Sequence, residues 1–412
     1  MEAMIERSCG IDVHKSSLTA CLLVGKLDDK EAKTINTFST MTDDLFALKD
    51  WLKAEGCTHV AIESTGVYWK PVFNILEDSL TVILANAREI KNVPGRKTDI
   101  KDCEWIARLL RFGLIQASFI PPKPIRQLRD LTRYRAKLIR EMTSEKNRVQ
   151  KVLEDANIKL SSVATDIFGA SGKQMVNALL EADSTPEEIA QLAKGRLRSK
   201  IPALVEALRG NISDHHRYLI EMSLRHLEFL AESIADLDER IDKATEPYRG
   251  EQELLMSITG VSKGTSESII AEIGVDMNQF PSEAHLSSWA GVCPGNNESA
   301  GKRRSGKTTK GDTWLAASLL QAAWAASRTK KTYLKDKYHR IAARRGKKRA
   351  AVAIGHKILI YAYYVLRYRV PFHDLGEDYL HKMNTSVLQK KLIKRLEALG
   401  NKVILEPVLQ MA

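Results

Sequence analysis

Cysteine is scarce in this sequence, and its distribution excludes two protein classes. The chain of 412 residues contains five cysteines, an odd number, and no two of them form a Cys-x-x-Cys pair. Disulfide frameworks and structural zinc sites need cysteines that are paired or closely spaced. The scattered cysteines therefore predict a reducing, cytoplasmic compartment and no zinc site.

Long hydrophobic runs are lacking as well. No apolar segment approaches the roughly 20 residues that a membrane-spanning helix needs. The first residues, MEAMIERSCG, have neither the basic nor the apolar region of a secretory signal. We therefore expect no membrane partner. The hydrophobic content of 44% is that of a globular protein, and the length allows two or three domains.

Acidic residues are nearly missing from one part of the chain. Residues 301–370 contain 19 Lys and Arg but only two acids, whereas residues 1–120 contain 15 Lys and Arg and 17 Asp and Glu. The whole chain has a formal net charge of +12 and a pI of about 9.3. Self-repulsion in the basic block would go uncompensated without a bound polyanion. The charge therefore predicts nucleic-acid partners and a nucleoid-associated location.

Residues 1–120 have the pattern of a compact α/β domain. Three strand-like runs are followed by alternating helix-like and strand-like runs, which predicts a mixed sheet with helices on its faces. In such a sheet the first and fourth strands can be neighbours. The expected strands are 8–14, 18–25, 34–39, 58–63 and 81–85, and the expected helices are 43–54, 67–79 and 99–113.

Beyond a proline-rich boundary at residues 121–124 the patterns are mainly helical. Residues 121–250 predict a helical segment whose last helix, 215–245, has a heptad-like apolar seam. This seam fits a helix of an intramolecular bundle or a coiled coil, either within one chain or between chains. Residues 251–372 predict a second domain that begins like a helix-hairpin-helix or an ordinary αα-hairpin, and residues 373–412 form a tail.

Four carboxylates in the first domain have the placement of a metal-dependent nuclease site. Asp12 lies in the first apolar strand, Glu63 ends the fourth strand, and Asp99 and Asp102 share one face of a helix. Any one of them could be a helix cap or an ion-pair partner. Together, like charges need a cation, and an all-oxygen set suits Mg²⁺ or Mn²⁺. Two such ions can assist phosphodiester chemistry.

A polar loop in the second domain is another candidate site. It contains Ser299 and Ser305, both flanked by cations that could stabilise a phosphate. A loop serine is usually a turn residue, and spacing alone does not favour one serine over the other. Basic residues on the helix 125–155 and in this loop are candidate nucleic-acid contacts: Arg126, Arg129, Arg133, Lys302, Arg303, Arg304, Lys307 and Lys310.

Four motifs resemble a known family. GIDVHK, AIESTGVYW, GRKTDIKDCEWIARLL and WAGVCPGNNESAGKRRSGKTTKGD are similar to those of the bridge-RNA-guided insertion-sequence transposases, also called DEDD recombinases. The resemblance covers residues 8–372 in order. It implies a RuvC-like ribonuclease-H fold for residues 1–120, a coiled-coil segment and a transposase domain. It places the acidic tetrad on Asp12, Glu63, Asp99 and Asp102, and the nucleophile on Ser299.

The resemblance also implies a mechanism and partners. The serine attacks a DNA phosphate to form a 5′-phosphoserine link, and magnesium at the tetrad activates that phosphate. A structured guide RNA pairs with target and donor DNA, and homodimers assemble into tetramers. Two alternatives remain from the residues alone. One is a metal-dependent junction-resolving endonuclease in which water attacks, and the other is a nucleic-acid-binding protein without catalysis. The intact tetrad argues against the second alternative.

Overall fold

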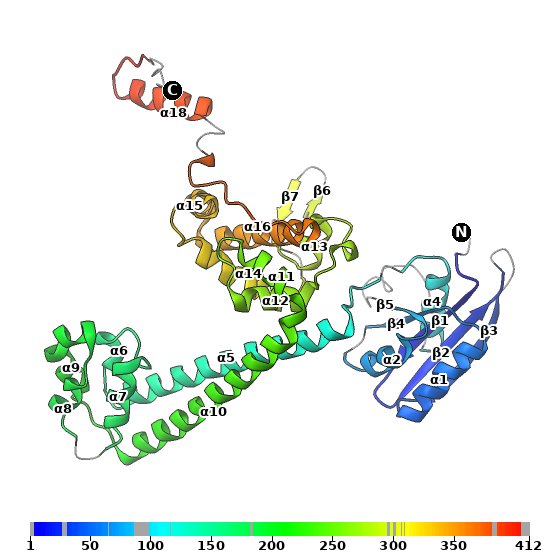
Figure 1. Cartoon of the computed structure of the whole chain (residues 1–412), viewed down its shortest axis with the longest axis horizontal. Coiled ribbons are helices and arrows are strands. Elements are labelled where there is room, and N and C mark those ends of the chain that lie inside the picture. Colours follow the sequence, from blue (N-terminus) through cyan, green and yellow to red (C-terminus); the bar gives the residue numbers. More distant parts are fainter. Residues whose placement is uncertain are drawn as a thin grey trace. The chain divides into compact units, whose positions relative to one another are not determined.

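The chain forms two compact units, Met1–Ile120 and Pro121–Ala412, which are shown in a computed structural model (Figure 1). No helix among the described residues is long and apolar enough to cross a membrane. The structure describes residues 4–26, 31–64, 66–85, 99–115, 117–181, 184–294, 297–299, 302–305, 307–308, 310–380 and 385–404.

The first unit is built on a five-stranded mixed sheet with the order β3-β2-β1-β4-β5. The first three strands are antiparallel neighbours, and β4 runs parallel to both β1 and β5. This order confirms the predicted mixed sheet, in which the first and fourth strands lie side by side. The elements are β1 (Arg7–Val13), β2 (Ser17–Val24), β3 (Ala32–Ser39), α1 (Thr42–Ala54), β4 (His59–Glu63), α2 (Trp69–Leu76), β5 (Thr81–Ala85) and α4 (Asp99–Arg111).

Alternation along β1 assigns its side chains to two different layers. Cys9, Ile11 and Val13 are buried in one hydrophobic cluster with apolar residues of α1 and α2. The residues between them face α4, because successive side chains of a strand point to opposite sides. On that side Cys103 and Ala107 of α4 pack with residues of β2. The helix α4 therefore covers the face of the sheet to which Asp12 belongs.

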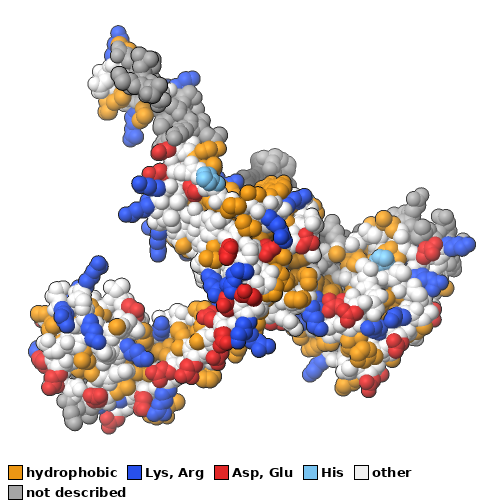
Figure 2. Space-filling model, in the orientation of Figure 1, with side chains coloured by type: hydrophobic (Ala, Val, Ile, Leu, Met, Phe, Trp, Pro, Cys, Tyr) orange, Lys and Arg blue, Asp and Glu red, His pale blue; other side chains and the backbone are white. Residues whose placement is uncertain are grey.

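Two long helices, α5 (Lys123–Asp155) and α10 (Asp214–Thr245), form an antiparallel arm in the second unit (Figure 1). Polar pairs fix the direction: His216 bonds Asp155 at 3.0 Å, and Arg135 bonds Asp238 at 2.7 Å near the other end. The apolar seam of α10 thus has a partner within the same chain. Figure 2 shows acidic and basic side chains side by side along this arm.

Short helices connect the two long ones. They enclose a separate hydrophobic cluster with the ends of α5 and α10, to which Val149, Met175, Leu204 and Ile220 belong. These elements are α6 (Leu160–Val163), α7 (Ala170–Ala178), α8 (Pro186–Gln191), η1 (Gly195–Lys200) and α9 (Ile201–Leu208).

The rest of the second unit is a helical bundle with one small hairpin. Its helix α16 lies in the core of the bundle, since Ile354, Ile358 and Leu359 are fully enclosed. The bundle confirms that the chain is mainly helical after the sheet. The elements are η2 (Glu246–Tyr248), α11 (Arg249–Met256), α12 (Lys263–Ile273), η3 (Met277–Gln279), α13 (Glu283–Trp289), β6 (Asn297–Ser299), β7 (Lys302–Ser305), α14 (Thr313–Ala326), α15 (Tyr333–Arg345), α16 (Lys347–Tyr368) and α18 (Thr385–Ala398).

Candidate active site

Asp12 and Glu63 lie at the same edge of the sheet. The parallel register of β1 and β4 pairs Ser8 with His59 and continues to the pair Ile11 and Ile62. One further residue along each strand brings Asp12 beside Glu63. Residues in register on parallel strands share a face. The two half-buried carboxylates therefore belong to one face at the carboxyl ends of adjacent strands.

The helix α4 lies directly on this face because Gly10 has no side chain. A Cβ atom at Gly10 would be 2.2 Å from the carbonyl oxygen of Cys103 and 2.4 Å from the backbone nitrogen of Ala107. The backbone nitrogen of Met4 bonds the carbonyl oxygen of Arg111 at 2.8 Å. The helix thus runs antiparallel to β1, so its first turn lies at the Asp12 end of the strand.

The face of α4 that packs on the sheet is apolar except in its first turn, which contains two acids. Cys103, Ile106 and Leu110 are buried against the sheet. Asp99 and Asp102 precede Cys103 and Ile106 by four residues, so they continue the same stripe by one turn. Asp102 is half-buried, and the side chain of Asp99 lies outside the described residues.

The electrostatics place Asp12 beside this helix. A hydrogen bond with Cys21 lowers the pKa of the Cys103 thiol, and the Asp12 carboxylate acts on the same pKa in the opposite direction. The Asp12 side chain is 14% exposed, and its carboxylate lies 3.3 Å from Nε2 of His14. The fold therefore directs three of the four predicted acids, together with the backbone of the fourth, toward one end of the sheet.

Their donor chemistry fits a hard divalent cation. Carboxylate oxygens are the ligands that Mg²⁺ and Mn²⁺ accept, whereas zinc prefers sulfur and nitrogen. The nearby thiols are engaged in the core, where the pair of Cys21 and Cys103 is fully buried. Among the described residues no three His, Cys, Asp or Glu side chains are already gathered closely enough to hold a metal ion. The complete set would need Asp99.

Ser299 ends one strand of a small β-hairpin. It pairs with Lys302 in register, so two residues separate the paired positions. An isolated bridge joins Pro294 and Thr308 farther down the loop. At the base, a Cβ at Gly311 would be 2.2 Å from the backbone nitrogen of Gly291, so the two chain segments touch there. This element, residues 291–311, is here called the serine hairpin.

The root of the serine hairpin is held by ion pairs around the buried Glu272. Asp312, which follows the hairpin, caps α14 by accepting bonds from the backbone nitrogens of Trp314 and Leu315 at 2.9 and 2.8 Å. Arg133 on α5 bonds Asp312 at 2.8 Å and donates two bonds of 2.7 Å to Glu272 on α12. The Glu272 side chain is 2% exposed, and burial raises its pKa against the opposing effect of Arg133.

Comparison with protein families shows to which family the chain belongs. A family model described as "Transposase", of the IS110 DEDD type, matches residues 9–158, and a model described as "Transposase IS116/IS110/IS902 family" matches residues 252–339. The chain belongs to the IS110 family of transposases. The first match contains β1, β4 and α4, and the second contains the serine hairpin. No curated protein matches the chain.

The candidate nucleic-acid contacts of this transposase fall into two groups. On α5, Arg129 donates bonds to the carbonyl oxygens of Ala271 and Glu272, and Arg133 is held by the carboxylates already named. These two arginines thus have structural partners inside the protein. Arg126 donates a bond to the carbonyl oxygen of Pro121. Of the hairpin cations, Lys307 and Lys310 are exposed, and the side chains of Lys302, Arg303 and Arg304 lie outside the described residues.

The corner between α15 and α16 exposes further cations. Arg344 and Arg345 end α15, and Lys347, Lys348 and Arg349 begin α16. None of the five has a carboxylate partner among the described residues. Lys347, Lys348 and Arg349 in the first turn of α16 oppose the macrodipole of that helix, whereas Arg344 and Arg345 in the last turn of α15 suit theirs. We call residues 344–349 the basic corner.

Sequence reasoning missed the buried network and the contact at Gly10. Glu272 gave a signal, since it stands alone in the apolar run SIIAEIG and a buried acid needs a cation. Its partners on α5 and α14 gave none, because only the packing of three helices brings them together. Gly10 precedes Asp12 in the first motif, but its close approach to α4 depends on sheet order.

Proposed function

We propose that this transposase cuts and rejoins DNA through a covalent bond to Ser299. The Oγ of Ser299 forms a bond to the scissile phosphorus, the bond from phosphorus to the 3′ oxygen breaks, and the departing 3′ oxygen takes up a proton. Attack by a 3′ hydroxyl of another strand then releases the serine. Because the phosphoserine conserves the phosphodiester bond energy, strand exchange needs no nucleotide cofactor.

The observation that carries this proposal is the way the serine is presented. Ser299 stands beside the turn of a hairpin whose base is pinched at Gly291 and Gly311 and whose root is fixed by Arg133 and Asp312. A fixed support for the reactive group reduces the freedom that must be lost in the transition state. Ser305 lies on the other strand, farther from the turn, so the hairpin favours Ser299.

The acids of the first unit are the proposed site for the metal. Asp12, Glu63, Asp99 and Asp102 would hold Mg²⁺ or Mn²⁺, which supplies charge stabilisation at the scissile phosphate when bound. The residues themselves would fix the position of that charge at the carboxyl ends of β1 and β4. Serine and acids belong to different units, which fits an active centre shared between subunits of a dimer or tetramer.

The excess of positive charge is the support for RNA guidance. Residues 301–370 contain 19 Lys and Arg and two acids, and the ion pairs of Arg340 with Asp336 and of Arg369 with Glu251 offset only a small part of this charge. A structured guide RNA together with target and donor DNA would neutralise this block. Purification of the protein followed by RNA sequencing tests this proposal. We expect to find a co-purifying RNA that matches DNA flanking the gene of the protein. If no such RNA is found, the protein itself must recognise the DNA sequence.

Two serine variants test the chemistry. With parental DNA and the co-purified RNA, the wild-type protein is expected to form a protein–DNA adduct that resists denaturant. Ser299→Ala should abolish the adduct, whereas Ser305→Ala, the matched control, should retain it. Cleavage by the wild-type protein without any adduct would overturn the proposal in favour of a nuclease in which water attacks.

A further inference from the structure

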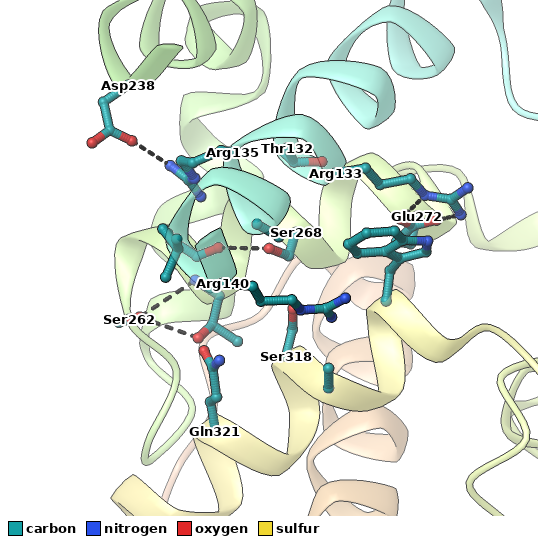
Figure 3. A pocket seen from close by; sticks show the side chains of 16 residues that line it. Thr132, Arg133, Arg135, Arg140, Asp238, Ser262, Ser268, Glu272, Ser318 and Gln321 are labelled. Atoms are coloured by element: carbon teal, nitrogen blue, oxygen red, sulfur yellow. Dashed lines mark hydrogen bonds and ion pairs between the residues drawn. The ribbon is translucent and has the colours of Figure 1, made fainter. Parts of the chain in front are cut away.

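A cavity of about 370 Å³ opens between α5, α12 and α14 (Figure 3). Its volume lies within the range of small-ligand sites, roughly 300–1,000 Å³. Figure 3 shows that Arg133, Arg135 and Arg140 approach it from α5, while Ser318 and Gln321 lie on the opposite wall, on α14. All the lining residues belong to the second unit, and none of them belongs to the serine hairpin.

The three arginines of the cavity are in different situations. Arg133 is fixed by Glu272 and Asp312, and Arg135 is fixed by Asp238 and Glu267. Arg140 is exposed and has no carboxylate partner among the residues that the structure describes. One guanidinium at the rim is therefore available to an anion from outside, and the other two hold the walls in place.

Arg140 instead lies over an aromatic ring. Its Cζ is 4.7 Å from the centroid of the Trp314 ring, and Cζ of Arg133 is 5.8 Å from the same centroid. Trp314 is half-buried, whereas the nearby aromatic residues Tyr333 and Tyr338 are core positions. A partly open indole beside an unpaired guanidinium can stack with a flat ring whose neighbouring group is an anion.

The polar groups at α12 and on α14 differ in whether they are already hydrogen-bonded. At α12, Ser268 donates its hydroxyl to the carbonyl oxygen of Gly264 at 2.9 Å, and the hydroxyls of Ser262 and Thr265 are 3.1 Å apart. In the described part of the chain, Ser318 and Gln321 make no side-chain hydrogen bond. A ring entering beside Trp314 would therefore meet a free hydroxyl and a free amide, groups that bond the polar edge of a nucleobase.

We propose that this cavity holds one unpaired nucleotide of a nucleic acid strand. The base stacks on Trp314 with its edge toward Ser318 and Gln321, and the adjoining phosphate is bound by Arg140. The proposal rests on the nucleic-acid function of the transposase and is independent of the chemistry of Ser299. Strand exchange requires opened duplexes, so unpaired nucleotides of the DNA or of a guide RNA are both available as occupants.

The experiment measures affinity for a short mixed-sequence single strand, made once as DNA and once as RNA. Arg140→Ala is expected to weaken binding about tenfold, the order of loss for one hydrogen bond between charged groups. Lys137→Ala is the matched control, because it removes one exposed positive charge from the same helix outside the cavity. The polymer that shows the larger loss with Arg140→Ala identifies the occupant.

Trp314 provides a second, independent readout. Replacing the stacked nucleotide with an abasic residue should weaken the affinity of the wild-type protein. The same replacement should leave the affinity of Trp314→Leu unchanged, because that variant has no ring on which a base can stack. In Trp314→Phe the abasic residue should again weaken the affinity, by most of the wild-type effect. Thermal unfolding checks that these variants fold. Equal losses for Arg140→Ala and Lys137→Ala would overturn the proposal, as would an abasic effect that survives Trp314→Leu. Adduct formation at Ser299 is measured separately on the wild-type protein, so failure here is distinguishable from failure of the proposed reaction.

Discussion

The helix α4 in the first unit and the root of the serine hairpin in the second are fixed by opposite kinds of contact. Gly10 lets the backbone of α4 touch β1, so that contact depends on the absence of a side chain. Arg133, Glu272 and Asp312 join three helices through ion pairs, so that contact depends on every side chain being present. The first should be sensitive to added volume and the second to lost charge, and this contrast can be tested.

The largest effect on stability is expected at Glu272. Glu272→Ala leaves Arg129 and Arg133 without their shared carboxylate in a buried place, which should lower the free energy of unfolding by about 3–5 kcal/mol. Chemical denaturation measures the loss. Glu253→Ala, which removes an exposed acid of α11, is the control and should stay within about 0.5 kcal/mol of the wild type. Equal stability of the two variants would show that the ion pairs of Glu272 do not stabilise the fold.

Asp12→Asn tests the chemical role of the sheet edge. The change keeps the volume of the side chain and removes its charge, so activity should fall by about 10²-fold or more while the fold persists. Adduct formation and circular dichroism measure the two properties. Asp50→Asn, at an exposed position of α1, is the control. Full activity of Asp12→Asn would exclude this acid from the active centre.

Gly10→Ala tests the close contact of α4 with β1. The new Cβ would lie 2.2 Å from the carbonyl oxygen of Cys103, so the helix must move away. Overpacking of this kind costs about 1–3 kcal/mol, and the shift also carries Asp102 away from Asp12. In contrast, Gly250→Ala meets no atom within 4 Å and should be neutral or slightly stabilising. Similar unfolding curves for both variants would contradict the contact.

The smallest effect is expected at the basic corner. Replacing Lys347 and Lys348 with alanine should reduce the slope of log affinity against log salt by about 0.9 for each lost phosphate contact on duplex DNA. Replacing Arg196 and Arg198 removes the same charge from exposed positions of η1 and should leave the slope unchanged. An unchanged slope in the first variant would show that the corner does not contact phosphates.

Much of the first unit follows from sequence patterns. The five strands lie within two residues of their predicted bounds, because alternation in β1 and β2 and apolar runs in β4 and β5 are local signals. The proximity of Asp12 and Glu63 also followed, since it needs only the order of two strands. The helix α2 is shorter than predicted, at Trp69–Leu76, because its apolar pattern continues into turns that do not complete the helix.

The support of the candidate site could not be predicted in the same way. The ion pairs of Glu272 join residues separated by more than one hundred positions. The hydrophobic periodicity of a sequence does not predict contacts between residues so far apart. The seam of α10 predicted a helical partner but left its identity open, and its half-buried Leu224, Ile234 and Leu237 show a seam covered by a single helix. Trp314 gave the same apolar signal as the buried Tyr338, and only packing separates their roles.

The most direct test of the central claim, that acids of the sheet and the hairpin serine act on one phosphate, uses a sulfur-substituted scissile phosphate. Mn²⁺ accepts sulfur more readily than Mg²⁺ does. The account predicts that the Ser299 adduct forms poorly on this DNA in Mg²⁺, recovers in Mn²⁺, and is lost in Asp12→Asn under both conditions. Equal adduct formation in both metals, or with the metals removed, would contradict it.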